Sequence, residues 1–425
     1  MSATWTGLWR RPMVGNALSL YAVQGLNYLV PLLLVPYLLR TLGTNAYGSI
    51  VFSQALIGYV VVVTDYGFNL TAARDISVAR EDPTAVARIY WTIMAAKLLL
   101  LLVSLAVVSI IALLTPALRH AWPVTACCAV TAIGSVALPQ WYFQGTERLR
   151  EMAVVQALSK AATAAGLIVW VHSPADVLGA ALLLSAPQLA AAIAALLIGQ
   201  RLTPGAFFRP KARDIGRALK SGWHLFVGGA AVALYGHTNT FVLGILCGDQ
   251  AVAVFNVGYR LVTALQSLVN PVIQAVYPRA SLLFDQDPRL GWELVRSVAR
   301  LLLPGIAAAS LLLALVAPSV VDLVGGHAFG QAAAVTRILC LTPPCVTAAM
   351  LLAQCVMVTN GLTQPLVRIY MAVGALNLLV LPLLVTCFAA QGAALSLVLA
   401  ELLGPALMLR IVMQLKPGTV QERAS

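Results

Sequence analysis

The chain has 425 residues, of which 60% are hydrophobic and 10% are charged. Soluble proteins are about a quarter charged, so this chain has too little polar surface to fold as a globule in water. A net charge of +12 would suggest nucleic acid as the partner of a soluble protein. In a membrane protein it reflects basic cytoplasmic loops. We therefore expect an integral membrane protein that contacts membrane lipids, binds no nucleic acid and has no large soluble domain.

Apolar stretches long enough to cross a bilayer follow one another along the chain, with charged or Pro/Gly-rich points between them. Six are expected in the first half, at about 16–40, 46–70, 89–114, 123–145, 153–171 and 177–199. Six more are expected at about 223–246, 250–278, 298–317, 335–358, 364–388 and 391–415. The pattern predicts an all-α membrane protein with about 12 transmembrane helices.

Basic residues predict the orientation of these helices. Of the 27 lysines and arginines, 21 lie on the side of the membrane that holds the N-terminus. Three lie in the opposite loops (Arg40, Arg119 and Arg337), and three lie inside spans (Lys97, Lys160 and Arg260). Because cytoplasmic loops are rich in lysine and arginine, we expect both termini in the cytoplasm.

A basic stretch at 201–222 separates the two groups of six spans. It predicts an N-terminal six-helix unit at 1–200, a cytoplasmic linker at 201–222, and a C-terminal six-helix unit with a short tail at 223–425. A short motif repeats between the halves: Gly43-x-x-Ala46-x-Gly48 corresponds to Gly248-x-x-Ala251-x-Ala253. Because six is an even number, two such halves share one orientation, as in many transporters.

The eighth span carries a polar stripe at helical spacing. Its members are Asn256, Arg260, Thr263, Ser267, Asn270 and Gln274. At about 100° per residue they fall within an arc of roughly 80°, and Arg260 lies roughly 15 Å below the outer loop. An arginine at that depth is costly to insert. Its role is either an internal salt bridge or the lining of a wet cavity for an anion, and six polar residues in register favour the cavity.

Other polar residues within spans leave two interpretations open. Span two has Gln54, Gly58, Asp65 and Asn69 at helical spacing, and span seven has His224, Gly228, Tyr235 and Asn239. Each set is either a packing seam or a cavity lining. Lys97 and Lys160 either line a site or extend toward the interface. Glu401, with Asp65, is a candidate for ion or proton coupling, and an ion pair is the alternative.

Motifs for catalysis and cofactor binding are absent from the sequence. There is no GxxxxGK[ST] phosphate loop for ATP hydrolysis, and no HExxH or GxSxG motif. The seven cysteines have no metal-site spacing. We expect no enzyme activity, no cofactor and no metal.

The segment from Asn27 to Ser77 resembles the opening of Wzx-type oligosaccharide flippases. The Pro-Tyr-x-x-Arg-x-Leu-Gly element (Pro36 to Gly43) and the TDYGFN element (Thr64 to Asn69) carry most of the match. In the other half, SGWHLF (221–226), NTFVLG (239–244) and QSLVNPVIQAVYPRAS (266–281) are also similar. Arg40, within the first element, joins the candidate cavity residues.

This family belongs to the multidrug/oligosaccharidyl-lipid/polysaccharide exporter superfamily. The resemblance implies two six-helix lobes around a central cavity in a bacterial inner membrane. It implies export of an undecaprenyl-pyrophosphate-linked oligosaccharide to the periplasmic leaflet, for O-antigen or another surface polysaccharide. A polysaccharide polymerase and a chain-length regulator are the expected protein partners. Arg260 would then contact the pyrophosphate.

Three alternatives remain. A drug/cation antiporter of the same superfamily needs acids in its cavity, and here only Asp65 and Glu401 are available. A lipid II flippase differs from an oligosaccharide flippase in its substrate, which transport assays can separate. A membrane glycosyltransferase or polymerase would be expected to have a sizeable outer loop with acidic residues, whereas the outer loops of this chain are short.

Overall fold

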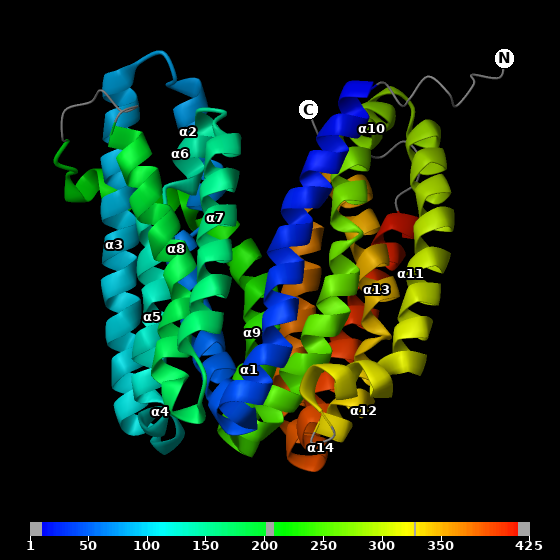
Figure 1. Cartoon of the computed structure of the whole chain (residues 1–425). Helices are drawn as coiled ribbons and strands as arrows, with labels where there is room; N and C mark the ends of the chain where they lie inside the picture. Colours follow the sequence, from blue (N-terminus) through cyan, green and yellow to red (C-terminus); the bar gives the residue numbers. More distant parts are fainter. Residues whose placement is uncertain (1–10, 201–207, 327–328, 415–425) are drawn as a thin grey trace.

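The structure is a computed structural model that describes residues 11–200, 208–326 and 329–414, and every regular element in these ranges is a helix (Figure 1). The first half contains α1 (Arg11–Asp65), α2 (Phe68–Val78), α3 (Pro83–Leu114), α4 (Pro116–His120), α5 (Trp122–Ala137), α6 (Gln140–Gly145), α7 (Leu149–Trp170), a 3-10 turn (Pro174–Asp176) and α8 (Val177–Gln200). The second half contains α9 (Ala212–Ser267), α10 (Asn270–Gln286), α11 (Pro288–Gly325), α12 (Gly330–Leu339), α13 (Thr342–Met350), a π-helix (Leu351–Val358) and α14 (Thr363–Gln414).

Three of the long helices change direction at one residue. Gly43 in α1 has φ 78° and ψ 175°, and Gly248 in α9 has φ 79° and ψ −179°. Only glycine adopts this conformation readily, so the repeated glycine of the sequence motif marks the same turn in both halves. The third turn is at Ala389 in α14, where φ is 47°.

These turns account for the number of membrane crossings. Eight apolar helical segments are long enough to span a bilayer, and the shorter apolar helix Val154–Trp170 is a further candidate. Three of the eight segments contain the turns at Gly43, Gly248 and Ala389, so each of these crosses twice. The described residues therefore provide twelve crossings. The predicted all-α membrane fold is confirmed.

An aspartate followed by a proline begins two of the long helices, α3 and α11. Asp82 accepts hydrogen bonds from the backbone N–H groups of Thr84 and Ala85, and Pro83 occupies the first turn of α3. The hydroxyl of Thr84 also donates to this carboxylate. These hydrogen bonds, the one from the Thr84 side chain above all, hold the pKa of Asp82 below its ordinary value. Asp287 and Pro288 begin α11 in the same way.

The two ends of the molecule are packed differently. We call the end at which Gly43 and Gly248 lie the hairpin face, and the opposite end, where α1 begins at Arg11 and α2 joins α3, the terminal face. At the hairpin face one hydrophobic core combines residues of α1, α5, α9, α12 and α14. Toward the terminal face there are two separate cores, one around Phe68 and Trp141, against which the start of α9 also packs, and one around Ile273 and Met357.

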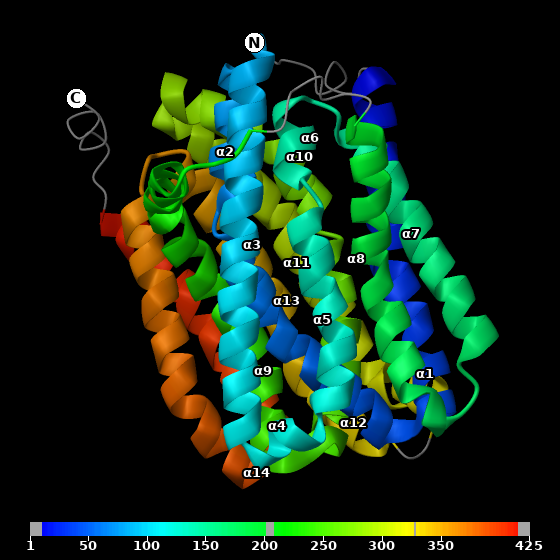
Figure 2. The same ribbon diagram turned by 90° about the vertical axis from the view of Figure 1, so that its left-hand side faces the viewer.

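The figures show the consequence of this packing. In Figure 1 two helix bundles converge at the hairpin face, at the bottom, and diverge toward the terminal face, at the top. The first part of α1 stands in the bundle of α10, α11 and α13, and the first part of α9 lies in the bundle of α3, α5 and α8. Figure 2 shows the molecule from the side of the first half. The helices α3, α5, α7 and α8 stand side by side there, each running between the hairpin face and the terminal face. Large apolar side chains are exposed on α3, α11 and α14, among them Leu102, Leu312 and Leu379. Such a surface fits a lipid environment.

The structure differs from the expected boundaries in two places. The eighth span is divided between α9, which ends at Ser267, and α10, which begins at Asn270. Pro271 has no N–H to donate to the carbonyl of Ser267, so the hydrogen-bond ladder breaks there. In addition, the last part of the predicted linker is helical, because α9 begins at Ala212. Residues 201–207 of that linker lie outside the described residues.

Candidate functional site

A pocket lies between the two halves of the chain. Its volume is about 130 Å³, and its walls come from α1, α7, α8 and α9. The lining residues are Leu34, Val35, Leu38, Tyr47, Ile50, Gln54, Lys160, Thr163, Leu184, Pro187 and Arg260. Gln54 and Arg260 lie eleven and twelve residues beyond the turns at Gly43 and Gly248, which is roughly 16–18 Å along a helix. The pocket is therefore near the middle of a bilayer about 30 Å thick.

Two cationic side chains line this pocket from opposite halves. Arg260 comes from α9, and Lys160 comes from α7. For Lys160 the sequence left open whether the side chain lines a site or extends to the interface, and the structure places it in the wall. Among the lining side chains that the structure describes there is no aspartate or glutamate. Two cations without an acid in the wall favour an anionic ligand.

Arg260 is held by a neighbour on its own helix. Its Nε donates to Oδ1 of Asn256, one turn earlier, at 2.9 Å. The same oxygen accepts a hydrogen bond of 2.8 Å from the hydroxyl of Tyr47 in α1. None of the salt bridges found among the described residues involves Arg260. A guanidinium has five N–H donors, so this arrangement orients Arg260 without using its whole capacity.

The four residues of the polar stripe that follow Arg260 do not line this pocket. The hydroxyl of Thr263 donates to the carbonyl of Tyr259 at 2.9 Å, and that of Ser267 donates to the carbonyl of Ala264 at 2.6 Å. Asn270 and Gln274 belong to α10, beyond the helix break, and Gln274 is exposed. These four residues are not among those that line the pocket. The helix break before Pro271 separates Asn270 and Gln274 from Arg260, whereas Thr263 and Ser267 lie on α9 with it.

Asp65 is paired with a lysine rather than with Arg260. Nζ of Lys97 lies 3.2 Å from Oδ1 of Asp65 and donates to the carbonyl of Ser135 at 3.0 Å. This contact joins α1, α3 and α5 within the first half. Asn69 is separated from Asp65 by a turn in which Gly67 has φ 75°, so the predicted stripe of span two does not continue as one helical face.

The other charged candidates lie away from the pocket wall. Arg40 is at the hairpin face, where Nη2 donates to the carbonyl of Leu323 in α11 at 2.7 Å. Glu401, in α14, interacts electrostatically with Tyr259, Tyr370 and Cys345. Neither residue is among those that line this pocket. Among the described residues there is no group of three or more histidine, cysteine or acidic side chains arranged to hold a metal ion.

The seam between spans two and seven is mainly a packing seam. A methyl group at Gly58 would overlap the ring of His237, and Phe52 stacks on Phe241 with ring centres 5.7 Å apart. The hydroxyls of Tyr59 and Thr238 are 2.8 Å apart. Gln54 is the exception, because it lines the pocket. The side chains of His224, Gly228 and Tyr235 in span seven lie outside the described residues.

Two six-helix halves that share one core at the hairpin face, with a pocket between them at mid-membrane depth, define a multi-pass membrane transporter. Residues 13–284 match the family described as "Polysaccharide biosynthesis protein". The chain is also 32% identical to the "Putative O-antigen transporter" of Escherichia coli (strain K12), over 93% of this chain and 96% of that one. The chain belongs to this polysaccharide biosynthesis family, and its resemblance to the Wzx-type flippases is confirmed.

Solved structures show the same fold at low sequence identity. The lipid II flippase MurJ in an inward closed conformation has a TM-score of 0.74 at 10% identity, covering 96% of this chain and 89% of that one. An inward-facing multidrug resistance MATE family transporter has a TM-score of 0.72 at 13% identity, covering 95% and 96%. This likeness shows that the chain shares their fold.

Proposed function

We propose that this protein is a flippase that moves an undecaprenyl-pyrophosphate-linked oligosaccharide from the cytoplasmic to the periplasmic leaflet for O-antigen synthesis. The observation that carries the proposal is the pair of cations, Arg260 and Lys160, that line one pocket from opposite halves. A pyrophosphate has several negative oxygens, so it can bind an arginine fork on one side and a lysine on the other. Gln54 and Thr163 supply hydrogen-bonding groups beside them.

The distribution of basic residues supports the orientation. The terminal face carries the beginning of α9, with Arg213, Arg217 and Lys220, and the junction between α10 and α11, whereas Arg119 and Arg337 are near the hairpin face. By the positive-inside rule the terminal face is cytoplasmic, in a bacterial inner membrane. The two helix bundles diverge toward that face (Figure 1). A substrate made in the cytoplasmic leaflet would therefore enter from the side on which the bundles are apart.

The membrane potential would favour outward movement of a negatively charged substrate. With the cytoplasm negative, moving two negative charges outward gains about 4.6 kcal/mol per 100 mV. Asp65 and Glu401 remain the candidates for ion or proton coupling. The lipid-linked precursor is the proposed substrate, and a polymerase and a chain-length regulator are the proposed partners.

The proposal is tested with purified protein in liposomes. A fluorescent undecaprenyl-pyrophosphate oligosaccharide is incorporated in both leaflets, and a membrane-impermeant quencher is added outside. We expect the wild-type protein to make the inner-leaflet pool accessible, and the Arg260→Ala variant to leave it protected. Labelled lipid II and a cationic dye are tested in parallel. Faster movement of either of these, with none of the oligosaccharide lipid, would contradict the proposal and favour the corresponding alternative.

A further inference from the structure

Arg260 in the pocket and Tyr47 in the closed hairpin face share one hydrogen-bond acceptor. Oδ1 of Asn256 accepts from Nε of Arg260 at 2.9 Å and from the hydroxyl of Tyr47 at 2.8 Å. Asn256 and Arg260 lie one turn apart on α9, whereas Tyr47 belongs to α1 in the other half of the chain. Tyr47 and Asn256 are both buried. One amide oxygen therefore connects the cation of the pocket with a contact between the halves.

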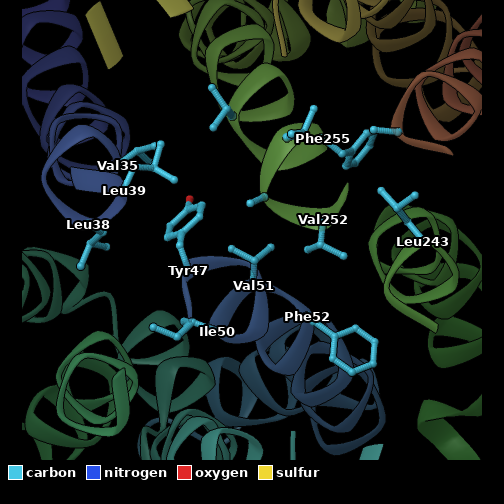
Figure 3. Close-up of a cluster of buried hydrophobic side chains, with 14 of the residues drawn as sticks. Val35, Leu38, Leu39, Tyr47, Ile50, Val51, Phe52, Leu243, Val252 and Phe255 are labelled. Atoms are coloured by element: carbon cyan, nitrogen blue, oxygen red, sulfur yellow. The ribbon is translucent and has the colours of Figure 1, made fainter. Parts of the chain in front are cut away.

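Tyr47 is part of the packing that closes the hairpin face. Figure 3 shows its ring among Leu38, Leu39 and Val51, in the cluster that also contains residues of α9 such as Val252 and Phe255. The neighbouring Gly48 is in contact with the backbone of Asp249. Tyr47 also lines the pocket. Its side chain thus forms part of the pocket wall and part of the hydrophobic closure.

The positions of these three residues indicate how ligand binding can affect the closure. An asparagine side chain can turn about its own bonds, and the hydrogen bond from Arg260 holds Oδ1 toward Tyr47. A phosphate oxygen is a stronger acceptor than an amide oxygen, and the guanidinium fork matches phosphate geometry. When Arg260 turns to a phosphate, Asn256 loses this constraint. The buried bond from Tyr47 is then less well ordered.

We propose that Asn256 and Tyr47 form a latch that couples occupation of the pocket by an anion to opening of the hairpin face. The latch rests on the proposed function in one respect, that the ligand is a pyrophosphate lipid. A ligand shifts a two-state equilibrium only as far as its contacts differ between the states. The shared oxygen provides such a difference, because Arg260 bonds Asn256 when the pocket is empty and the phosphate when it is filled. Tyr47 and Asn256 are positioning residues in this scheme.

The test measures hydrogen exchange of the purified full-length protein by mass spectrometry. The peptides of interest cover residues 40–55 and 244–260, with and without undecaprenyl pyrophosphate. In the wild type, we expect the ligand to raise exchange at both turns. Tyr47→Phe keeps the ring and removes the hydroxyl, so exchange should be raised roughly 2- to 10-fold without ligand, as for the loss of one buried hydrogen bond. Adding ligand should then have little further effect.

A matched control is available in the same pair of helices. Tyr59→Phe also removes a tyrosine hydroxyl bond between α1 and α9, the one to Thr238, but Tyr59 does not line the pocket. We expect this variant to keep the full response to ligand. If Tyr47→Phe responds to undecaprenyl pyrophosphate as strongly as the wild type and Tyr59→Phe do, the latch is wrong.

A second arm needs no ligand and separates the latch from the proposed substrate. Arg260→Ala removes the donor that orients Asn256, so it should raise exchange at the turn around Tyr47. In the Tyr47→Phe background the same change should add little, because Arg260, Asn256 and Tyr47 form one group of interacting side chains. Additive effects would overturn the latch. If the two changes are non-additive but undecaprenyl pyrophosphate does not bind in a separate binding assay, the latch stands and the proposed substrate is wrong.

Discussion

The backbone of Gly48 in α1 lies directly against the carbonyl group of Asp249 in α9, so that a methyl group at position 48 would overlap it. The two residues follow the corresponding turns at Gly43 and Gly248. This contact brings the two halves of the chain together at the hairpin face, and it is possible only because position 48 has no side chain. Any residue larger than glycine should therefore oppose closure of that face.

Gly48→Ala should shift the protein toward a state that is open at the hairpin face. Overpacking of this kind typically costs about 1–3 kcal/mol, which corresponds to a shift of roughly 5- to 150-fold between the two states. Hydrogen exchange at the turn around Gly248 should rise, and export should fall. Gly179→Ala is the control, because Gly179 has open space around it. Normal exchange and export in Gly48→Ala would show that the contact is not needed for closure.

Arg260 should be essential for export. Arg260→Ala should abolish complementation of a flippase-null strain while the protein still accumulates in the membrane. Arg260→Lys should retain part of the activity, since lysine keeps the charge but lacks the planar fork, and Arg260→Glu should be inactive. Immunoblots of membrane fractions are measured beside surface polysaccharide. Full activity of the alanine variant at normal abundance would exclude an anion contact at this position.

Lys160 should make a smaller contribution to transport than Arg260. It lines the pocket from α7, but an ammonium group forms a point contact rather than a paired one with phosphate. We expect Lys160→Gln to lower the rate of transport in liposomes about 10-fold, and Lys160→Arg to retain most of it. Lys220→Gln, at an exposed site on α9, is the charge-matched control. Equal rates for Lys160→Gln and the wild type would argue against a second cation contact.

Loss of Asp65 should destabilise the protein more than loss of Lys97, its partner in the ion pair. The side chain of Lys97 is 1% exposed and that of Asp65 is 38% exposed. Asp65→Asn leaves a buried cation without its counter-ion, a change that costs about 3–5 kcal/mol for fully buried pairs. Lys97→Met leaves a carboxylate that water can reach, so its effect should be smaller. Thermal unfolding of detergent-solubilised protein should rank Asp65→Asn as the less stable variant.

The double variant Asp65→Asn/Lys97→Met provides the control for this pair. It removes both charges, so it should recover most of the stability lost in Asp65→Asn. If the double variant is no more stable than Asp65→Asn, the ion pair is not the source of the destabilisation.

The topology can be tested with reporter fusions. Fusions after residues 80, 210 and 290 should report the cytoplasm, and fusions after 119, 249 and 326 should report the periplasm. A phosphatase reporter is active only in the periplasm, and a fluorescent protein reporter identifies the cytoplasmic sites. A cytoplasmic result at 249 would contradict the arrangement of two equal halves.

Most of the architecture could be predicted from the sequence, because it follows from local properties of the chain. A bilayer requires apolar helices of a certain length, and basic residues are unequally distributed between its two sides. Twelve crossings and two equal halves follow from these two patterns. The turn at Gly248 was indicated by the repeat of the Gly43 motif. Arg260 is a candidate site residue from the sequence because an arginine at mid-membrane depth is costly to insert.

The composition of the site was decided by tertiary structure. Lys160 could not be distinguished from a lysine that extends to the interface, because its surroundings come from other helices. The spacing of the polar stripe predicts one face of a single helix. In the structure, the backbone hydrogen bonds of that helix are interrupted before Pro271, and Gln274 lies on a different helix from Arg260. Asp65 could have paired with Arg260 by charge alone, but α1 and α3 place it beside Lys97. The bond from Tyr47 to Asn256 joins residues 209 positions apart. Contacts at such separations depend on how the helices pack, which the periodicity of each helix does not specify.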